Sequence, residues 1–365
     1  MVLATAAPAL AASPYVVGVP LPETGAEAAM GTDMFQAMKL AAAQINAQGG
    51  VLGHKIQLIE EDSACDPQTS VNAANKLVAL KVQAVVGTYC SSAALPAEPI
   101  FERAGLPFVM PDANATDLTA NGFKDVFQAN ANGQAQANTA SFFLVKILKA
   151  KRIAIVDDQS EYAVNLATLT QKAIAKLHGN VVDVEAVPAT TQDFSSLINK
   201  LQSENVDAVY WTGYYAQGGL LIKQARQHSF KSQILVADGS VDNILITTAG
   251  AKNAQGVYAT MTPMPPFLTG AAATAFTKAY TSRFHMQPGP YSALAYDSIK
   301  ILATAATRAK SIAPAKVITA LHAVNYTGIT GPISFSSNGV RHDAHFLVLM
   351  VKNGKFTLAP VQPKF

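Results

Sequence analysis

The chain has 365 residues, more than the about 250–300 over which a single hydrophobic core usually extends, so two domains are expected. Half of the residues are hydrophobic and 14% are charged, with a net charge of +3, a composition that excludes an intrinsically disordered chain. No cluster of Lys and Arg is longer than Lys151-Arg152, so no nucleic-acid partner is expected. The sequence contains no run of 18 apolar residues, so no membrane-spanning helix is expected.

Residues 1–14 form an alanine-rich leader without a charged side chain. Its end, Leu10-Ala11-Ala12-Ser13, offers small residues of the kind that signal peptidase accepts. We interpret the leader as the remnant of an export signal, which predicts a periplasmic protein. A disordered leader without a targeting role is the alternative.

Short β-type runs alternate with helical patterns through the first part of the chain. After the run at 15–19, apolar residues at helical spacing predict a helix over 31–48, which ends at Gly49-Gly50. Such alternation predicts a mostly parallel, doubly wound sheet. The further strands expected here are 56–60, 84–89 and 107–110, and the further helices 69–80 and 93–103.

A second cycle of the same kind begins near residue 131, so the chain is expected to fold as two similar α/β lobes. An Asn353-Gly354 turn between residues 345–351 and 355–358 predicts a β-hairpin near the C-terminus. The strands expected in this part are 152–157, 181–187, 208–212, 234–237 and 256–261, and the helices 132–148, 162–177, 194–203, 216–228, 271–284 and 291–308.

The sequence lacks the common signatures of enzymes: there is no Walker A motif, no GxGxxG after a strand, no HExxH and no GxSxG. His342 and His345 have weak metal-binding spacing in an expected turn. Ser91 follows Cys90 at a strand end, but no base lies near it in the sequence. We therefore expect no catalytic residue, no metal and no cofactor.

Polar residues follow several of the expected strands, at the edge where doubly wound sheets bind ligands. Ser91 either caps the next helix or, with the helix N–H groups, binds a carboxylate. Asp112 and Asn114 follow the next strand, and Tyr214 follows the strand at 208–212. Asp238 either faces a ligand ammonium or forms an ordinary Asp-Gly turn.

Four segments resemble the leucine/isoleucine/valine-binding proteins, the periplasmic solute-binding proteins of ABC importers, and the resemblance covers nearly the whole chain from Pro14 onward. The pairing of CDP with CSS is specific to this group. The segments are DSACDP (62–67), VVGTYCSS (85–92), RIAIVDD (152–158) and DFSSL (193–197).

The resemblance implies two lobes that close on a ligand like a hinged clamp, joined by three crossovers near 127–131, 255–259 and 332–336. The first lobe would comprise residues 15–129 and 257–333, and the second 130–256 and 334–365. The two cysteines suggest a disulfide in an exported protein and two free thiols in a cytosolic one. By resemblance, Cys65 and Cys90 form the family's disulfide beside the ligand loop.

The resemblance carries over a set of ligand-binding positions. Ser91 matches the serine that takes the ligand α-carboxylate, and Asn114 falls where a threonine is usual. Asp112 stands where a small residue is usual. If its side chain enters the pocket, the site favours a cationic or polar ligand; if it only caps the next helix, selectivity is unaffected. The glutamate that binds the ammonium has no direct match, and we expect Asp238 to replace it. The residues expected to line the side-chain part of the pocket are Met30, Tyr162, Tyr214 and Tyr291.

The sequence thus predicts a monomeric carrier that binds a small, aliphatic amino acid and delivers it to the membrane permease of an ABC importer. One alternative is the same role for a non-amino-acid carboxylate such as an aromatic acid, because the glutamate with which the family binds the ligand ammonium has no direct match in this sequence. Two further alternatives are a ligand-sensing regulator and a hydrolase that uses Ser91.

Overall fold

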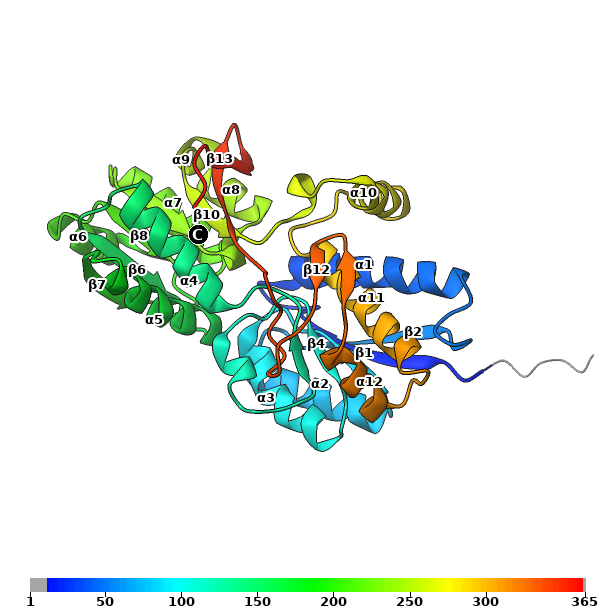
Figure 1. The fold of residues 1–365 in the computed structure, drawn as a ribbon. Helices are drawn as coiled ribbons and strands as arrows, with labels where there is room; N and C mark the ends of the chain where they lie inside the picture. Colours follow the sequence, from blue (N-terminus) through cyan, green and yellow to red (C-terminus); the bar gives the residue numbers. More distant parts are fainter. Residues whose placement is uncertain (1–11, 364–365) are drawn as a thin grey trace, which may run out of the picture.

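Two α/β lobes make up the computed structural model, which describes residues 12–363 (Figure 1). In Figure 1 the first lobe, at lower right, contains the blue, cyan and orange elements. The second lobe, at left, contains the green elements and the red C-terminal hairpin. The expected fold class is confirmed, since each lobe holds its own sheet with helices around it. Most of the predicted leader, residues 1–11, lies outside the described residues.

The first lobe is built on a five-stranded sheet in the order β2-β1-β3-β4-β5, in which all pairs are parallel. Its strands are β1 (Tyr15–Leu21), β2 (Ile56–Asp62), β3 (Ala84–Val86), β4 (Phe108–Met110) and β5 (Val126–Gln128), with the small hairpin β11 (Tyr326–Gly328) and β12 (Gly331–Ile333) beside them. Its helices are α1 (Ala28–Ala47), α2 (Pro67–Ala79), α3 (Ser91–Arg103), α10 (Ala271–Phe284), α11 (Ser292–Arg308), α12 (Pro314–His322) and the 3-10 turn η1 (Thr116–Thr119).

The second lobe is built on a seven-stranded sheet in the order β14-β13-β10-β9-β8-β6-β7. Its strands are β6 (Ile153–Asp157), β7 (Val181–Ala186), β8 (Ala208–Trp211), β9 (Gln233–Val236), β10 (Tyr258–Met261), β13 (Leu347–Lys352) and β14 (Lys355–Leu358). Its helices are α4 (Gly133–Phe142) with the π-helical segment η2 (Phe143–Ile147) that continues it, α5 (Glu161–Lys176), α6 (Ser195–Ser203), α7 (Tyr215–Gln227), α8 (Asn243–Ala249), α9 (Ala251–Ala254) and the 3-10 turn η3 (Asp238–Ser240). The predicted hairpin around Asn353-Gly354 is confirmed, because β13 and β14 pair antiparallel up to Lys352 and Lys355.

The central strands are continuous apolar runs because helices cover both faces of the sheet. Every residue of β6 and of β8 is buried. At the start of α2, the Asp66 carboxylate accepts a hydrogen bond from Thr69 N at 2.8 Å, and Pro67 occupies the first turn. Within residues 12–363, no helix has both the length and the apolar character needed to cross a membrane.

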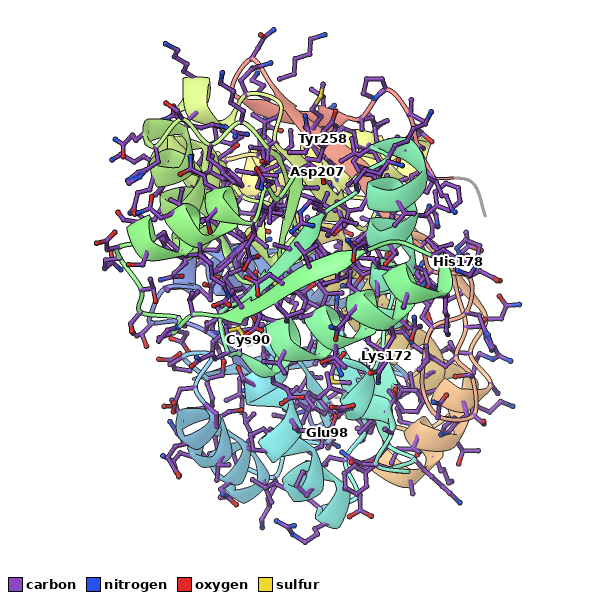
Figure 2. The ribbon with its side chains drawn as sticks, turned by 90° about the vertical axis from the view of Figure 1, so that its left-hand side faces the viewer. Cys90, Glu98, Lys172, His178, Asp207 and Tyr258 are labelled. Carbon is purple, nitrogen blue, oxygen red and sulfur yellow. A yellow bond between two sulfur atoms is a disulfide. The ribbon has the colours of Figure 1, made fainter. Side chains whose placement is uncertain are left out.

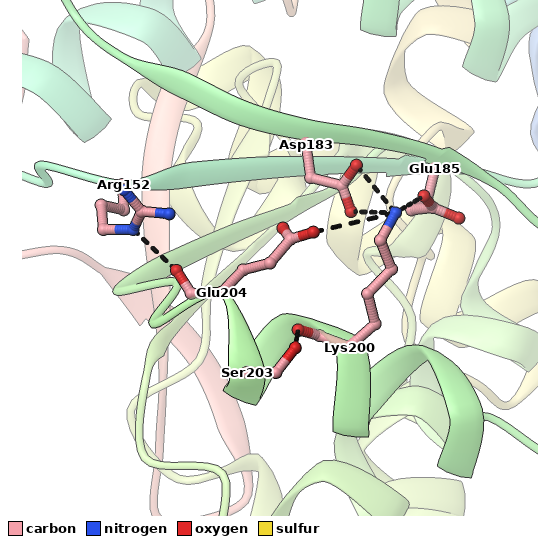
Figure 3. Close-up of polar contacts among 6 residues, drawn as sticks. All are labelled: Arg152, Asp183, Glu185, Lys200, Ser203 and Glu204. Atoms are coloured by element: carbon pink, nitrogen blue, oxygen red, sulfur yellow. Dashed lines mark hydrogen bonds and ion pairs between the residues drawn. The ribbon is translucent and has the colours of Figure 1, made fainter.

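Charged side chains protect the exposed edge of the second sheet, which β7 forms (Figure 3). Lys200 of α6 lies against Asp183 and Glu185 of β7, with Nζ 2.9 Å from Asp183 Oδ2, and it also bonds Glu185. Charges on an edge strand hinder its pairing with a second chain. We interpret this cluster as a structural feature of the fold.

β10 belongs to the second lobe, which corrects the lobe boundary expected at residue 257. It pairs parallel with β9 and antiparallel with β13, so the chain completes a fifth strand of the second sheet before it returns to the first lobe. The second crossover is therefore the segment 262–270 and not 255–259.

The third crossover also lies later than expected, after residue 341 rather than at 332–336. Gln128 N donates to Gly339 O at 2.8 Å, and Phe335 pairs with Arg341, so this stretch still packs on the first lobe. The Arg341 guanidinium donates to Ala129 O at 3.0 Å, which ties the first crossover to the third. In Figure 1 the orange-red chain then rises to β13.

Candidate ligand-binding site

A small cavity lies between the lobes, beyond the carboxyl ends of strands from both sheets. Its volume is about 10 Å³, which is room for about one water molecule, so an amino acid fits only when the lobes move apart. Seven of the eight predicted site residues line it; Met30 is buried in α1 and is not among the lining residues. The lining residues are Tyr89, Ser91, Asp112, Asn114 and Tyr291 of the first lobe, and Tyr162, Tyr214, Asp238 and Gly239 of the second.

Ser91 lies at the first turn of α3, directly after a disulfide. Cys65 and Cys90 are bonded, as predicted, and the disulfide fixes the loop that enters the helix. Figure 2 shows Cys90 near the level at which the lobes meet. Ser91 Oγ accepts a hydrogen bond from Ala115 N at 3.2 Å, which leaves its hydroxyl hydrogen free to donate into the cavity.

Asp112 and Asn114 lie on the turn that follows β4. Asn130 Nδ2 lies 3.2 Å from both the carbonyl oxygen and Oδ1 of Asp112, which orients that residue. Asn114 Nδ2 reaches across to the second lobe, where it lies 3.3 Å from Asp238 Oδ2. Asn114 Oδ1 is buried and, among the described residues, has no hydrogen-bond partner.

Asp238 opens η3 directly after β9 and is held by a network within its own lobe. The hydroxyl of Tyr162 donates to Asp238 Oδ1, and Gln136 Nε2 donates to the same oxygen at 2.9 Å. Gln136 Nε2 also lies 2.9 Å from Thr260 Oγ1, which anchors the amide to β10. The second lobe therefore fixes the position of this carboxylate through three of its elements.

Four tyrosine rings run in sequence around the cavity and cross from one lobe to the other. The ring centroids of Tyr291 and Tyr89 are 5.5 Å apart, those of Tyr89 and Tyr214 are 5.8 Å apart, and those of Tyr214 and Tyr162 are 5.4 Å apart. Gly239 permits this packing, because a Cβ there would lie 3.0 Å from Tyr214 Cδ1. Asp112 and Asp238, which line the same cavity as these rings, are both almost fully buried.

The cavity has an acidic character that its lining residues do not balance. None of the nine lining residues is Lys, Arg or His. Burial raises the pKa of the Asp112 carboxyl well above its usual range, and the nearby charge of Asp238 raises it further. Burial also raises the pKa of Asp238, although hydrogen bonds from Tyr162 and Gln136 oppose this shift.

Two contacts outside the cavity also join the lobes. Thr116 of η1 donates from N and Oγ1 to Asn165 Oδ1 of α5, at 3.2 and 3.3 Å, and Asn165 Nδ2 lies 3.0 Å from Thr116 Oγ1. The hydroxyl of Tyr215 in α7 donates to the carbonyl of Ala26, just before α1. These bonds act between protein groups alone, independent of what fills the cavity.

Comparison with known proteins agrees with this geometry. The sequence model of a family described as periplasmic binding protein matches residues 14–355. The chain belongs to the periplasmic binding protein family. Its resemblance to the leucine/isoleucine/valine-binding proteins is confirmed: it is 33% identical to the leucine-specific-binding protein of Salmonella typhimurium over 316 residues, 87% of this chain and 85% of that protein.

Solved members of the periplasmic binding protein family share the fold over nearly the whole chain. A leucine binding protein from Thermotoga maritima superposes with a TM-score of 0.87 at 29% identity, covering 95% of this chain and 98% of that chain. A branched-chain amino acid transporter substrate binding protein from Streptococcus pneumoniae, in complex with isoleucine, also gives 0.87 at 28% identity, covering 96% and 100%.

Three residues of the site were not predicted from the sequence. Tyr89 and Gly239 adjoin predicted positions, Cys90-Ser91 and Asp238, so a strand-end rule extended by one residue would have found both. Gln136 had no local signal, because only the fold brings it to Asp238. In residues 12–363, no three or more His, Cys, Asp or Glu side chains are grouped to hold a metal ion; the expected absence of a metal or cofactor stays a prediction.

Proposed function

We propose that this protein is the periplasmic solute-binding component of an ABC importer and that it binds one small amino acid as a zwitterion between its lobes. In this role it acts as a monomer, hands its cargo to the membrane permease and catalyses no reaction. The family membership supports the carrier role, and the cavity between the lobes supports the choice of ligand.

The observation that carries the proposal is the arrangement of opposite chemistry in one cavity. On one side lie the Ser91 hydroxyl and the N-terminal N–H groups of α3, which suit a carboxylate. On the other side Asp238 and Asn114 present acceptor oxygens that suit an ammonium. Because Ser91 and Asp238 belong to different lobes, a ligand that binds both stabilises closure.

The alternatives from the sequence have less support. A carboxylate without an ammonium would place an anion against Asp112 and Asp238, with no Lys, Arg or His among the lining residues to balance the charge. A hydrolase would need a base beside Ser91, and no His lines the cavity. No observation on the described residues favours a regulator.

The test is a titration of the unfolded and refolded, ligand-free protein with leucine, 4-methylpentanoate and isopentylamine. The two analogues lack the ammonium and the carboxylate of leucine, respectively. We expect leucine to bind and each analogue to bind at least about 100-fold more weakly, because each loses a pair of charge-assisted hydrogen bonds. At 100 times its Kd, leucine should stabilise the protein by about 2.7 kcal/mol.

Comparable affinity for leucine and 4-methylpentanoate would contradict the assignment of Asp238 and favour the carboxylate alternative, for which benzoate serves as the aromatic probe. Absence of binding by every α-amino acid would contradict the proposed function. A matched variant, Asp193→Asn, removes an exposed carboxylate of the second lobe and should leave all three affinities unchanged.

A further inference from the structure

Asp112 is a second carboxylate in a pocket whose proposed function requires only one. It belongs to the first lobe, whereas Asp238 belongs to the second, and both line the same cavity. Both are almost fully buried, at 6% and 2% exposure. Within residues 12–363, Asn130 Nδ2 is the one hydrogen-bond donor to the Asp112 carboxylate, so most of its acceptor capacity is unused.

A ligand with one ammonium and one carboxylate cannot neutralise both Asp112 and Asp238. The ammonium of such a ligand pairs with one carboxylate, and the second then remains buried without a counterion. A buried, unpaired charge is costly, and the raised pKa of Asp112 reflects that cost. A second positive charge on the ligand removes the cost, because each carboxylate then has a cation of its own.

Unpartnered oxygens of other residues also point to a ligand rich in hydrogen-bond donors. Asn114 Oδ1 and the Tyr89 hydroxyl oxygen are buried and lack a partner among the described residues, and both residues line the cavity. An ammonium brings three donors and can satisfy several such oxygens at once. The tyrosine rings add attraction, because a cation over an aromatic face is stabilised by the ring quadrupole.

We propose that Asp112 makes this site selective for amino acids that carry a second ammonium on a short side chain. The inference rests on the proposed function, since it assigns the α-carboxylate to Ser91 and the α-ammonium to Asp238. Because Ser91, Asp112 and Asp238 line the same small cavity, the α-carboxylate and the two ammonium groups of the ligand must lie within a few carbon atoms of one another. In this arrangement, the second ammonium lies between Asp112 and the tyrosine rings.

The test uses two isosteric pairs of ligands that differ only in charge: 2,4-diaminobutyrate with norvaline, and ornithine with norleucine. Isothermal titration of the refolded, ligand-free wild type should give about 10- to 100-fold tighter binding of a diamino acid than of its apolar isostere. In Asp112→Asn, which keeps the shape of the side chain, this preference should fall to threefold or less. Asp117→Asn, an exposed position on η1, is the control and should keep the wild-type preference.

Tighter binding of norvaline and norleucine by the wild type would overturn the inference and leave the proposed function intact. An unchanged preference in Asp112→Asn would also overturn it, because the charge would then be recognised elsewhere. Failure of every α-amino acid to bind, these four compounds and leucine included, would overturn the proposed function itself. If the Asp112 variant fails to fold, the comparison in the wild type alone still overturns the inference when the apolar isosteres bind more tightly.

Discussion

The two walls of the cavity differ in how completely their polar atoms are satisfied. In the second lobe, Asp238 is held by Tyr162 and Gln136, and Gln136 is anchored in turn to Thr260. In the first lobe, Asn114 Oδ1 and the Tyr89 hydroxyl lack partners among the described residues. The comparison indicates that the second lobe is organised before a ligand arrives, whereas the first lobe offers groups that a ligand completes.

Among the variants of the site, loss of the Asp238 carboxylate should weaken ligand binding the most. We expect Asp238→Ala to weaken the binding of an amino acid by about 100-fold or more, because the ligand ammonium loses its charged partner in a buried site. Isothermal titration measures the loss, and Asp238→Asn separates the charge from the shape of the side chain. If Asp238→Ala retains the wild-type affinity, the second wall does not hold the ammonium.

Loss of one hydroxyl from the opposite wall should have a smaller effect. In Ser91→Ala, the ligand carboxylate loses a single hydrogen bond but keeps the N–H groups of α3, so the Kd should rise about 10-fold. Ser92→Ala is the matched control, because Ser92 Oγ donates to Cys65 O and does not line the cavity. Equal losses in the two serine variants would point to a disturbed helix start rather than to a lost ligand contact.

A third test addresses the boundary between the lobes, where Glu27 of the first lobe is buried near Tyr215 of the second and is exposed to the charges of Asp158 and Asp242. Burial is the main cause that raises the pKa of Glu27 from 4.5 to about 8, and the neighbouring charges of Asp158 and Asp242 add to it. The stability that this group contributes is therefore fully present below pH 4.5 and is lost as the pH rises toward 8.

Glu27→Gln replaces the titratable carboxyl with a neutral amide and should make the stability of the protein depend less on pH. We expect the melting temperature of the variant to exceed that of the wild type by about 2–4 °C at pH 8.5 and to match it near pH 4.5. Thermal unfolding across this range measures the difference, with the exposed Glu102→Gln as the control. A constant offset at every pH would show that Glu27 does not titrate against the second lobe.

Strand ends are the part of the site that local sequence can predict. Ser91, Asp112 and Asp238 each follow a short apolar run, and the geometry of doubly wound sheets brings such positions to one edge. The same rule does not find Gln136, which lies within a helix and reaches Asp238 only through tertiary packing. Met30 was expected from resemblance alone, and the structure buries it in α1 outside the lining.

The assignment of a strand to a sheet is not a local property either. The run that forms β10 has the same apolar character as strands of either lobe, so its pattern predicts a strand but not its neighbours. Its place beside β9 depends on pairing across more than twenty residues of intervening chain. Most elements of the two main sheets were predicted, but β5, α8, α12 and the β11–β12 hairpin were not, and the lobe boundary required the tertiary structure.

The bonds between Thr116 and Asn165 give the closed form a lifetime that does not depend on its cargo. A ligand leaves only after the lobes part, and these three bonds must break in that step although neither residue touches the cavity. Their strength therefore enters the dissociation rate of every ligand by the same factor and leaves the relative affinities unchanged. The contact between Thr116 and Asn165 therefore helps to set how long a ligand stays bound, but not which ligand the protein selects.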